Sequence, residues 1–276
     1  MMNRSPPRPC EPKQRVEDPL RMDPDCAWSW EYGWRNQSRR INLWEQSISP
    51  LGHVGPSMML SLRCNGRGRL LRRCLCWNIR GLNDPCKRRA VYNTMVEHRI
   101  HMCCLQETKM EEVSEATVRE TGGGFLDAHI YKGAVGTAGR MMIMWNSGKW
   151  RAIAKSGGRF SILVLLECRK SGWTWVCSCV YGPHDDQSRE QLWDELSAVR
   201  AEWNYPWVIL GDFNVTRYVG DRNRPGPISP GMTSFSSWID EEGLLDIPLC
   251  NSSYTWSNMQ EVPSMARLDR VLLNTD

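Results

Sequence analysis

The sequence of 276 residues predicts an α/β domain with mixed β-sheets, preceded by a basic leader. Three observations predict this class. Apolar runs of strand length alternate irregularly with amphipathic helical stretches, which is typical of layered α/β domains. In the middle of the chain, apolar runs follow one another across short turns, which favours a mixed sheet over a purely parallel one. Hydrophobic residues make up 41% and charged residues 24% of the chain, as expected for a globular protein with a core.

Residues 1–73 are predicted to be a disordered, Pro/Arg-containing leader. They carry 13 Lys and Arg against 7 Asp and Glu, whereas residues 74–276 carry 22 against 24. The leader has no sustained periodicity and holds clusters such as RSPPRPCEPKQR. A basic segment of this kind can bind nucleic acid, and a solvated linker explains the same composition.

The composition argues against a membrane protein and against a secreted disulfide scaffold. The longest apolar run, Ile162–Leu166, is too short to span a bilayer, and the N-terminus lacks the apolar region of a signal peptide. Twelve cysteines occur, but pairs such as Cys74 and Cys76 lie at i,i+2 inside apolar runs, and no Cys-x-x-Cys pair is present. We therefore expect free thiols and an intracellular location, the nucleus included.

The first half of the domain is predicted as a strand, a helix and three further strands. The run LLRRCLCWN (70–78) ends at Asn78, and the helix over 85–98 opens with a proline that suits the first helical turn. Its apolar residues then recur at helical spacing. Further buried strands are predicted over 100–108, 140–146 and 160–168. The turn-rich stretch NSGKWRAIAKSGGR is expected to separate the last two.

The second half alternates strands and helices more regularly. The predicted elements are a strand over 172–183, a helix over 189–203, a strand over 207–211, a helix over 232–245, and strands over 254–258 and 267–274. The first of these helices carries Leu192, Leu196, Val199 and Trp203 on one apolar stripe. The strand WVILG is a continuous apolar run, which indicates burial on both faces.

Polar residues stand at the ends of four predicted strands: Asn78, Glu107, Tyr181 and Asp212. Asn214 follows Asp212 by two positions, and residues i and i+2 of an extended chain project to the same side. One sheet rim with these groups suits Mg²⁺, which takes few carboxylates together with water and phosphate oxygens. It indicates phosphoester hydrolysis by an activated water. Each residue alone also has a structural explanation, such as an Asx turn for the Asp212 pair.

Six short motifs occur in a fixed order along the domain. They are WNIRGLN (77–83), LQETK (105–109), VYGP (180–183), GDFN (211–214), YTWSN (254–258) and RLDRVLL (267–273). This set resembles the endonuclease/exonuclease/phosphatase superfamily, and most closely the nuclease domain of plant LINE-type retrotransposons. The resemblance covers residues 74–276 and implies a DNase I-like, two-sheet α/β sandwich flanked by helices, with the site at the top of the sheets.

The resemblance also implies roles for the rim residues. Glu107 would be the metal ligand for Mg²⁺ or Mn²⁺, and Asn78 and Asn214 would position the metal-bound phosphate and the water. Asp212 would activate the attacking water. Tyr181 would donate a hydrogen bond to the phosphate or stabilise the transition state.

Four further residues are candidates outside this set. By the same resemblance, Asp269 in RLDRV would support the catalytic histidine of the family. Arg222 and Arg224 could touch a DNA backbone from the loop after GDFN, and His184 could donate to a phosphate. A solvated loop explains these last three residues equally well.

The catalytic histidine of the family stands in a Ser-Asp-His motif beyond the RLDRV strand. This sequence contains neither that triplet nor the strand that normally follows it. We therefore expect 74–276 to be an incomplete domain whose last strand is missing and whose site is weak or inactive. Losing one transition-state donor typically lowers the rate about 100- to 1000-fold.

Three functions follow from the sequence. The first is a metal-dependent phosphodiester hydrolase resembling a retrotransposon DNA endonuclease. The second is a phosphatase of the same superfamily, and the third is a non-catalytic, truncated fragment that binds nucleic acid through its leader. DNA is the expected partner, and neither a membrane nor a protein partner is predicted.

Overall fold

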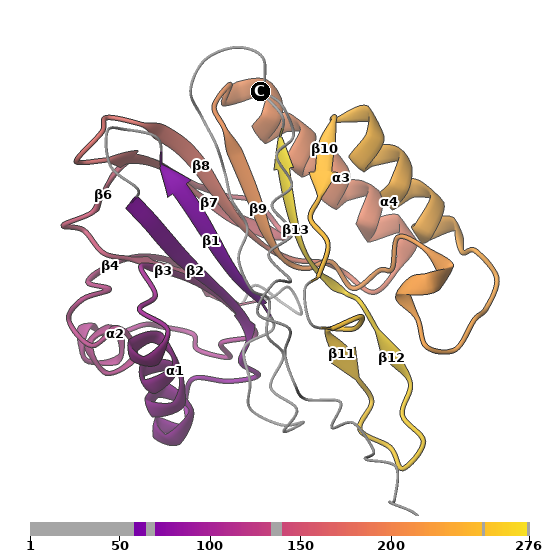
Figure 1. Cartoon of the computed structure of the whole chain (residues 1–276), viewed down its shortest axis with the longest axis horizontal. Helices are drawn as coiled ribbons and strands as arrows, with labels where there is room; N and C mark the ends of the chain where they lie inside the picture. Colours follow the sequence, from indigo (N-terminus) through magenta and orange to yellow (C-terminus); the bar gives the residue numbers. More distant parts are fainter. Residues whose placement is uncertain (1–57, 65–69, 134–139, 250–251, 275–276) are drawn as a thin grey trace, which may run out of the picture. The chain divides into compact units, whose positions relative to one another are not determined.

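The computed structural model describes residues 58–64, 70–133, 140–249 and 252–274. They form two β-sheets that face each other, with helices on the outer side of each sheet (Figure 1). The predicted α/β class, a two-sheet mixed sandwich flanked by helices, is confirmed.

The first sheet has five strands in the order β1-β2-β3-β5-β4. Their bounds are β1 Met58–Cys64, β2 Leu70–Asn78, β3 Met102–Gln106, β4 Ala128–Lys132 and β5 Met141–Trp145. β2 and β3 run parallel and are joined by the helix α1 (Pro85–Glu97), whereas the other neighbours are antiparallel. A second helix, α2 (Glu115–Gly122), packs beside α1.

The second sheet has six strands in the order β10-β13-β9-β8-β7-β6. Their bounds are β6 Trp150–Gly157, β7 Ser161–Cys168, β8 Thr174–Tyr181, β9 Trp207–Asp212, β10 Leu244–Asp246 and β13 Asp269–Asn274. β8 and β9 form its parallel pair, joined by the helix α3 (Asp186–Glu202).

Four further elements complete this half of the domain. The helix α4 (Pro230–Glu241) packs beside α3, and the 3-10 helix η1 (Val219–Asp221) lies in the connection between β9 and α4. The strands β11 (Trp256–Ser257) and β12 (Met265–Ala266) form a separate hairpin.

Each α-helix begins at a side chain that caps its free backbone N–H groups. Asp84, Ser114, Asp185 and Ser229 accept hydrogen bonds from the first turns of α1, α2, α3 and α4. Proline occupies the first turn of α1 and α4, where its missing N–H has no intrahelical partner to lose.

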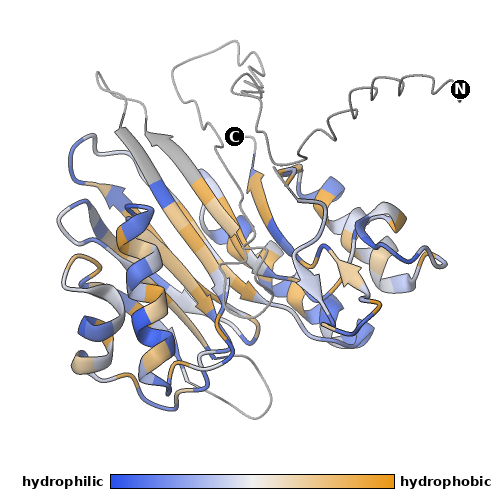
Figure 2. Cartoon of the chain, turned by 60° about the horizontal axis from the view of Figure 1, so that its bottom comes forward, coloured by the Kyte–Doolittle hydropathy of each residue, from blue (hydrophilic) through white to orange (hydrophobic). Residues whose placement is uncertain are grey.

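Apolar side chains form three layers of core. The first lies between the sheets, the second between the six-stranded sheet and α3 and α4, and the third between the five-stranded sheet and α1 and α2. Central strands such as β3 and β5 are buried along their whole length because both of their faces are covered. Figure 2 shows these apolar strands between helices whose outer faces are hydrophilic.

Four strands occur where the sequence predicts neither a strand nor a helix, namely β1, β4, β6 and β12. β1 lies inside the range predicted as a leader, so the sheet begins before Cys74, and Met58 and Leu60 are buried between the sheets. The prediction for residues 1–57 falls outside the described residues. β6 forms from the stretch that is predicted to be turns, because small or apolar residues alternate there with charged ones on an edge strand.

The last predicted helix is shorter than expected. α4 ends at Glu241, and Leu244 and Leu245 belong to β10, which pairs antiparallel with β13. Gly243 adopts a φ of 61° between the two elements, which ends the helix. Among the described helices, none combines the length and apolarity needed to cross a bilayer.

Candidate functional site

The two parallel strand pairs bring the predicted site residues to one rim of the sandwich. In each pair, the chain returns through a helix and runs in the same direction, so that the carboxyl ends lie side by side. Asn78 stands opposite Gln106 in the first sheet, and Tyr181 stands opposite Asp212 in the second. Asp269 on β13 is the antiparallel partner of Asp212.

The side chain of Asn78 joins the two sheets at this rim. Its Nδ2 donates to Oε1 of Glu107 at 2.7 Å and approaches Oδ2 of Asp212 at 3.4 Å. The hydroxyl of Tyr181 donates to the same Oε1 of Glu107 at 3.0 Å. One amide and one phenol therefore connect carboxylates that are far apart in the sequence, and neither carboxylate lies at a distant face of the domain.

Burial controls the protonation of two groups in the site. Asp212 is 6% exposed, and its pKa is raised above the ordinary value by burial and by the charge of Glu107, although hydrogen bonds from Asn214 and Asn78 oppose the shift. Burial and the neighbouring Glu107 also raise the pKa of Tyr181. The tyrosine therefore stays protonated at neutral pH and acts as a hydrogen-bond donor.

Two site residues have a left-handed backbone. Glu107 has a φ of 50° and Asn214 a φ of 51°, a conformation that is uncommon outside glycine. The backbone N–H of Asn214 donates to Oδ1 of Asp212 at 2.9 Å, and its Nδ2 donates to the carbonyl oxygen of Gly182 at 2.7 Å. Such conformations persist where the surroundings impose them, and they are frequent at functional sites.

Two glycines allow β8 and β9 to approach each other at the rim. A Cβ at Gly211 would overlap the backbone of Val180, and a Cβ at Gly182 would overlap the backbone of Phe213. The amide of Gly182 donates to the carbonyl oxygen of Asp212 at 2.7 Å. The glycine in GDFN and the glycine in VYGP therefore have a steric role.

Asp269 lies next to Asp212 and is buried. The hydroxyl of Thr255 accepts hydrogen bonds from the backbone N–H groups of Leu268 and Asp269, at 2.9 and 3.0 Å. Thr255 belongs to the YTWSN motif, so the structure explains why this motif accompanies RLDRV. The sequence alone predicts no role for Thr255.

The three predicted substrate-binding residues differ in their surroundings. Arg222 is turned toward its own loop, where its guanidinium donates to the carbonyl oxygen of Pro227 at 3.0 Å. Arg224 is exposed and donates to the carbonyl oxygen of Val262 at 2.7 Å. His184 is exposed and lies two positions after Gly182, in the connection between β8 and α3. Arg222 is thus less available to a ligand than the other two.

Gln106, the strand partner of Asn78, contacts two buried thiols. Gln106 is fully buried, and its Nε2 contacts Sγ of Cys76 at 3.0 Å and Sγ of Cys179 at 3.6 Å. Burial raises the pKa of Cys76, and the charges of Asp269 and Asp212 raise it further. Burial also raises the pKa of Cys104, Cys177 and Cys179, so these thiols stay protonated.

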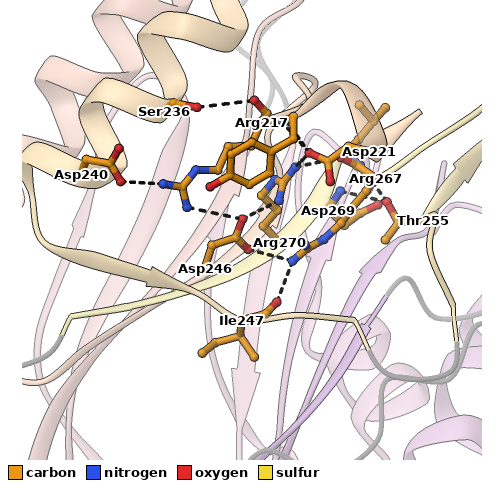
Figure 3. A network of polar contacts seen from close by, with 12 residues as sticks. Arg217, Asp221, Ser236, Asp240, Asp246, Ile247, Thr255, Arg267, Asp269 and Arg270 are labelled. Atoms are coloured by element: carbon orange, nitrogen blue, oxygen red, sulfur yellow. Dashed lines mark hydrogen bonds and ion pairs between the residues drawn. The ribbon is translucent and has the colours of Figure 1, made fainter. Parts of the chain in front are cut away.

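A buried network of arginine and aspartate lies on the opposite face of β13 (Figure 3). Arg270 is fully buried, pairs with Asp221 and donates to Oδ2 of Asp246 at 2.5 Å. Arg267 donates to Oδ1 of Asp246 at 2.7 Å, and burial lowers its pKa. Arg217 pairs with the exposed Asp240 at 2.6 Å. These contacts connect the segment after β9 with β10 and β13.

The carboxylate and amide oxygens at the rim match the ligands that Mg²⁺ prefers. Among the described residues, no group of three or more His, Cys, Asp and Glu side chains is arranged as a metal cage. Mg²⁺ requires no such cage, because it usually binds one or two protein carboxylates and keeps several waters. Both hydrogen bonds described for Glu107 end at Oε1, so Oε2 is left for another partner. The donor set therefore fits this ion.

The sequence over residues 75–276 matches the Endonuclease/Exonuclease/phosphatase family. Among the curated proteins, none matches the chain. The superfamily resemblance inferred from the six motifs is confirmed by the family match.

Three solved structures have a similar fold. The endonuclease domain of TRAS1, a telomere-specific non-LTR retrotransposon, is 12% identical, with 74% of this chain and 86% of that chain covered and a TM-score of 0.54. The human Nocturnin catalytic domain is 13% identical, with 79% and 85% covered and a TM-score of 0.53. A protein from Bacteroides thetaiotaomicron is 13% identical, with 73% and 82% covered and a TM-score of 0.51. At these identities the likeness concerns the fold.

Proposed function

Because the chain belongs to the endonuclease/exonuclease/phosphatase family, we propose that it hydrolyses phosphodiester bonds at the rim where Asn78 bridges Glu107 and Asp212. This bridge is the observation that carries the proposal. It joins one carboxylate suited to an oxygen-liganded metal and one suited to proton transfer, within reach of a single phosphate.

Glu107 and Oδ1 of Asn78 would hold Mg²⁺ or Mn²⁺. The bound ion would polarise a phosphoryl oxygen and offset the negative charge that develops on it. Asn78 has a second role, because its Nδ2 fixes Oε1 of Glu107 and leaves Oε2 for the ion. The hydroxyl of Tyr181 holds the same oxygen from the other sheet.

Asp212 would accept the proton of the attacking water. Its raised pKa brings it closer to neutral pH than an exposed aspartate, which suits a general base. Asn214 would orient this water or a phosphate oxygen. Its backbone N–H binds Oδ1 of Asp212, which keeps the two residues together. Asp269, the antiparallel partner of Asp212, would keep the role that the resemblance implies, which is to support a catalytic histidine.

DNA is the substrate that we propose. The six motifs resemble those of retrotransposon nucleases, and the TRAS1 endonuclease domain has a similar fold. The exposed Arg224 and His184 would contact the backbone of the nucleic acid.

Nicking of supercoiled plasmid in Mg²⁺ tests the proposal. We expect nicking that EDTA abolishes and that Glu107→Ala lowers at least about 100-fold. The matched control is Glu111→Ala, because Glu111 is a nearby carboxylate whose side chain is 85% exposed. It should nick like the wild type. Nicking that survives Glu107→Ala would refute the assigned site.

The same preparation separates the alternatives. Hydrolysis of a small phosphomonoester without nicking would indicate a phosphatase. Salt-sensitive DNA binding without hydrolysis of either substrate would indicate a non-catalytic, nucleic-acid-binding protein.

A further inference from the structure

Arg189, in the first turns of α3, contacts the backbone of a proposed site residue. Its Nη2 donates to the carbonyl oxygen of Asn214 at 2.8 Å. The side chain is only 12% exposed, and its Nη1 pairs with Asp186 one helical turn earlier. The guanidinium of Arg189 therefore binds the segment that follows β9, and it does so from the helical layer.

The start of α4 encloses the same guanidinium. A Cβ built on Gly231 would lie 2.9 Å from Nη1 of Arg189 and against the carboxylate of Asp186. A glycine at this position leaves the room that the ion pair occupies. The guanidinium is thus held between α3, α4 and the segment after β9, which restricts it to one orientation.

The backbone conformation of Asn214 is one that such a contact can stabilise. Its φ of 51° lies in the left-handed region, which is sparsely populated, although asparagine tolerates it better than most residues with a side chain. Its N–H and Nδ2 bind Asp212 and Gly182, which belong to the rim itself. Arg189 supplies the third contact, and it is the one that comes from the helical layer.

We propose that Arg189 is a positioning residue that holds Asn214 in the left-handed conformation and thereby fixes the Asp212 half of the site. The inference rests on the proposed function for its kinetic consequence. Without the guanidinium, the backbone of Asn214 would relax toward an ordinary φ. Its N–H would leave Oδ1 of Asp212, and its carboxamide would leave Gly182.

The kinetic test compares Arg189→Met with Arg217→Met in plasmid nicking. Arg217 is the matched control, because it is 10% exposed and pairs with an aspartate but makes no described contact with the rim. We expect Arg189→Met to lower kcat about 10- to 100-fold with KM within about twofold, the loss of one charge-assisted hydrogen bond. Arg189→Lys should recover about tenfold of this loss. Arg217→Met should keep the wild-type kcat.

A double variant separates positioning from general destabilisation. If Arg189 acts through Asn214, adding Arg189→Met to Asn214→Ala should lower kcat no further. Losses that multiply would overturn the proposal, and so would an equal loss in Arg217→Met.

Hydrogen exchange gives a readout that does not depend on activity. The amide of Asn214 should exchange at least about tenfold faster in Arg189→Met than in the wild type, and Arg217→Met should leave it protected. Unchanged exchange in Arg189→Met would overturn the proposal. A wild-type protein that hydrolyses no phosphoester would refute the proposed function, while the exchange rates would still decide whether Arg189 positions Asn214.

Discussion

Asp212 is the residue in which burial and catalysis oppose each other most directly. Its carboxylate must be ionised to accept a proton, yet it is buried beside Glu107, and its pKa is raised for that reason. Hydrogen bonds from Asn214 and Asn78 stabilise the charge only in part. The folded state therefore binds this proton more tightly than the unfolded state does.

The sign of this linkage gives a prediction for Asp212→Asn. Below the ordinary pKa of 3.8 the carboxyl is protonated in both states, so it imposes no penalty. As the pH rises from there through the raised pKa, the free energy of unfolding of the wild type should fall, and it should level off above. Asparagine cannot ionise, so the variant should not show this decline, while its nicking rate should drop about 100- to 10,000-fold.

Urea denaturation at a series of pH values measures the effect. Asp127→Asn is a control of opposite sign, because hydrogen bonds from Ser147 lower the pKa of Asp127 despite its partial burial. That variant should lose stability, relative to the wild type, as the pH rises. Parallel profiles for Asp212→Asn and the wild type would contradict the prediction.

Single residues were predictable from the sequence where a strand end fixes their direction. Asn78, Tyr181 and Asp212 follow apolar runs, and the parallel pairing of those runs brings them together. The positions of loop side chains were not predictable, because the sequence does not specify the direction in which a long side chain extends from a loop. For Arg222 the sequence left open a contact with a DNA backbone and a solvated loop, and its guanidinium donates to the carbonyl oxygen of Pro227.

The parallel strands β8 and β9 position the site residues that the second sheet contributes to the rim. The two strands can approach at the rim only because Gly211 has no side chain, and the backbone of Val180 occupies the place of its missing Cβ. This pairing sets Tyr181 opposite Asp212. A larger residue would separate the two strands at the point where the site begins.

Gly211→Ala should therefore lower the free energy of unfolding by about 2–3 kcal/mol, since the added methyl group meets backbone atoms that cannot move aside. Gly220→Ala is the control, because a Cβ there has open space around it. It should change stability by less than about 0.5 kcal/mol. Chemical denaturation measures both, and an equal effect of the two substitutions would show that the strand contact is unimportant.

Strands that are buried on both faces were easier to predict from the sequence than partly exposed edge strands. β3, β5 and β9 are covered on both faces, so their sequences are continuous apolar runs that could be recognised. β4 and β6 are edge strands with partly exposed faces, and neither was predicted. Their pairing depends on neighbours far away in the sequence, which no local pattern records.

At the scale of the molecule, the arginine and aspartate network holds the outer layer to the second sheet. Arg270→Met should lower the free energy of unfolding by about 3–5 kcal/mol, because Asp221 and Asp246 would stay buried without their partner. Arg151→Met, which removes an exposed pair with Glu167, should lower it by less than about 1 kcal/mol. Denaturation midpoints compare the two, and a small effect at Arg270 would contradict the assigned role.

The order of motifs along the chain predicted the sandwich and the position of its site, since both follow from the resemblance. The sequence did not indicate β1. Its short apolar run lies among basic residues, and its burial becomes evident only when the second sheet covers Met58 and Leu60. It also gave no sign of the network behind β13, whose members are distant in sequence.

Among the described strands, the chain passes from one sheet to the other a single time, between β5 and β6. The part of the chain before β6 contains Asn78 and Glu107. The part from β6 onward contains Tyr181, Asp212 and Asn214. Neither part contains all of the proposed reacting groups. These groups meet only where the two sheets are in contact. A shift of one sheet against the other by about 1 Å would therefore misplace them and lower the rate, while both sheets stay folded.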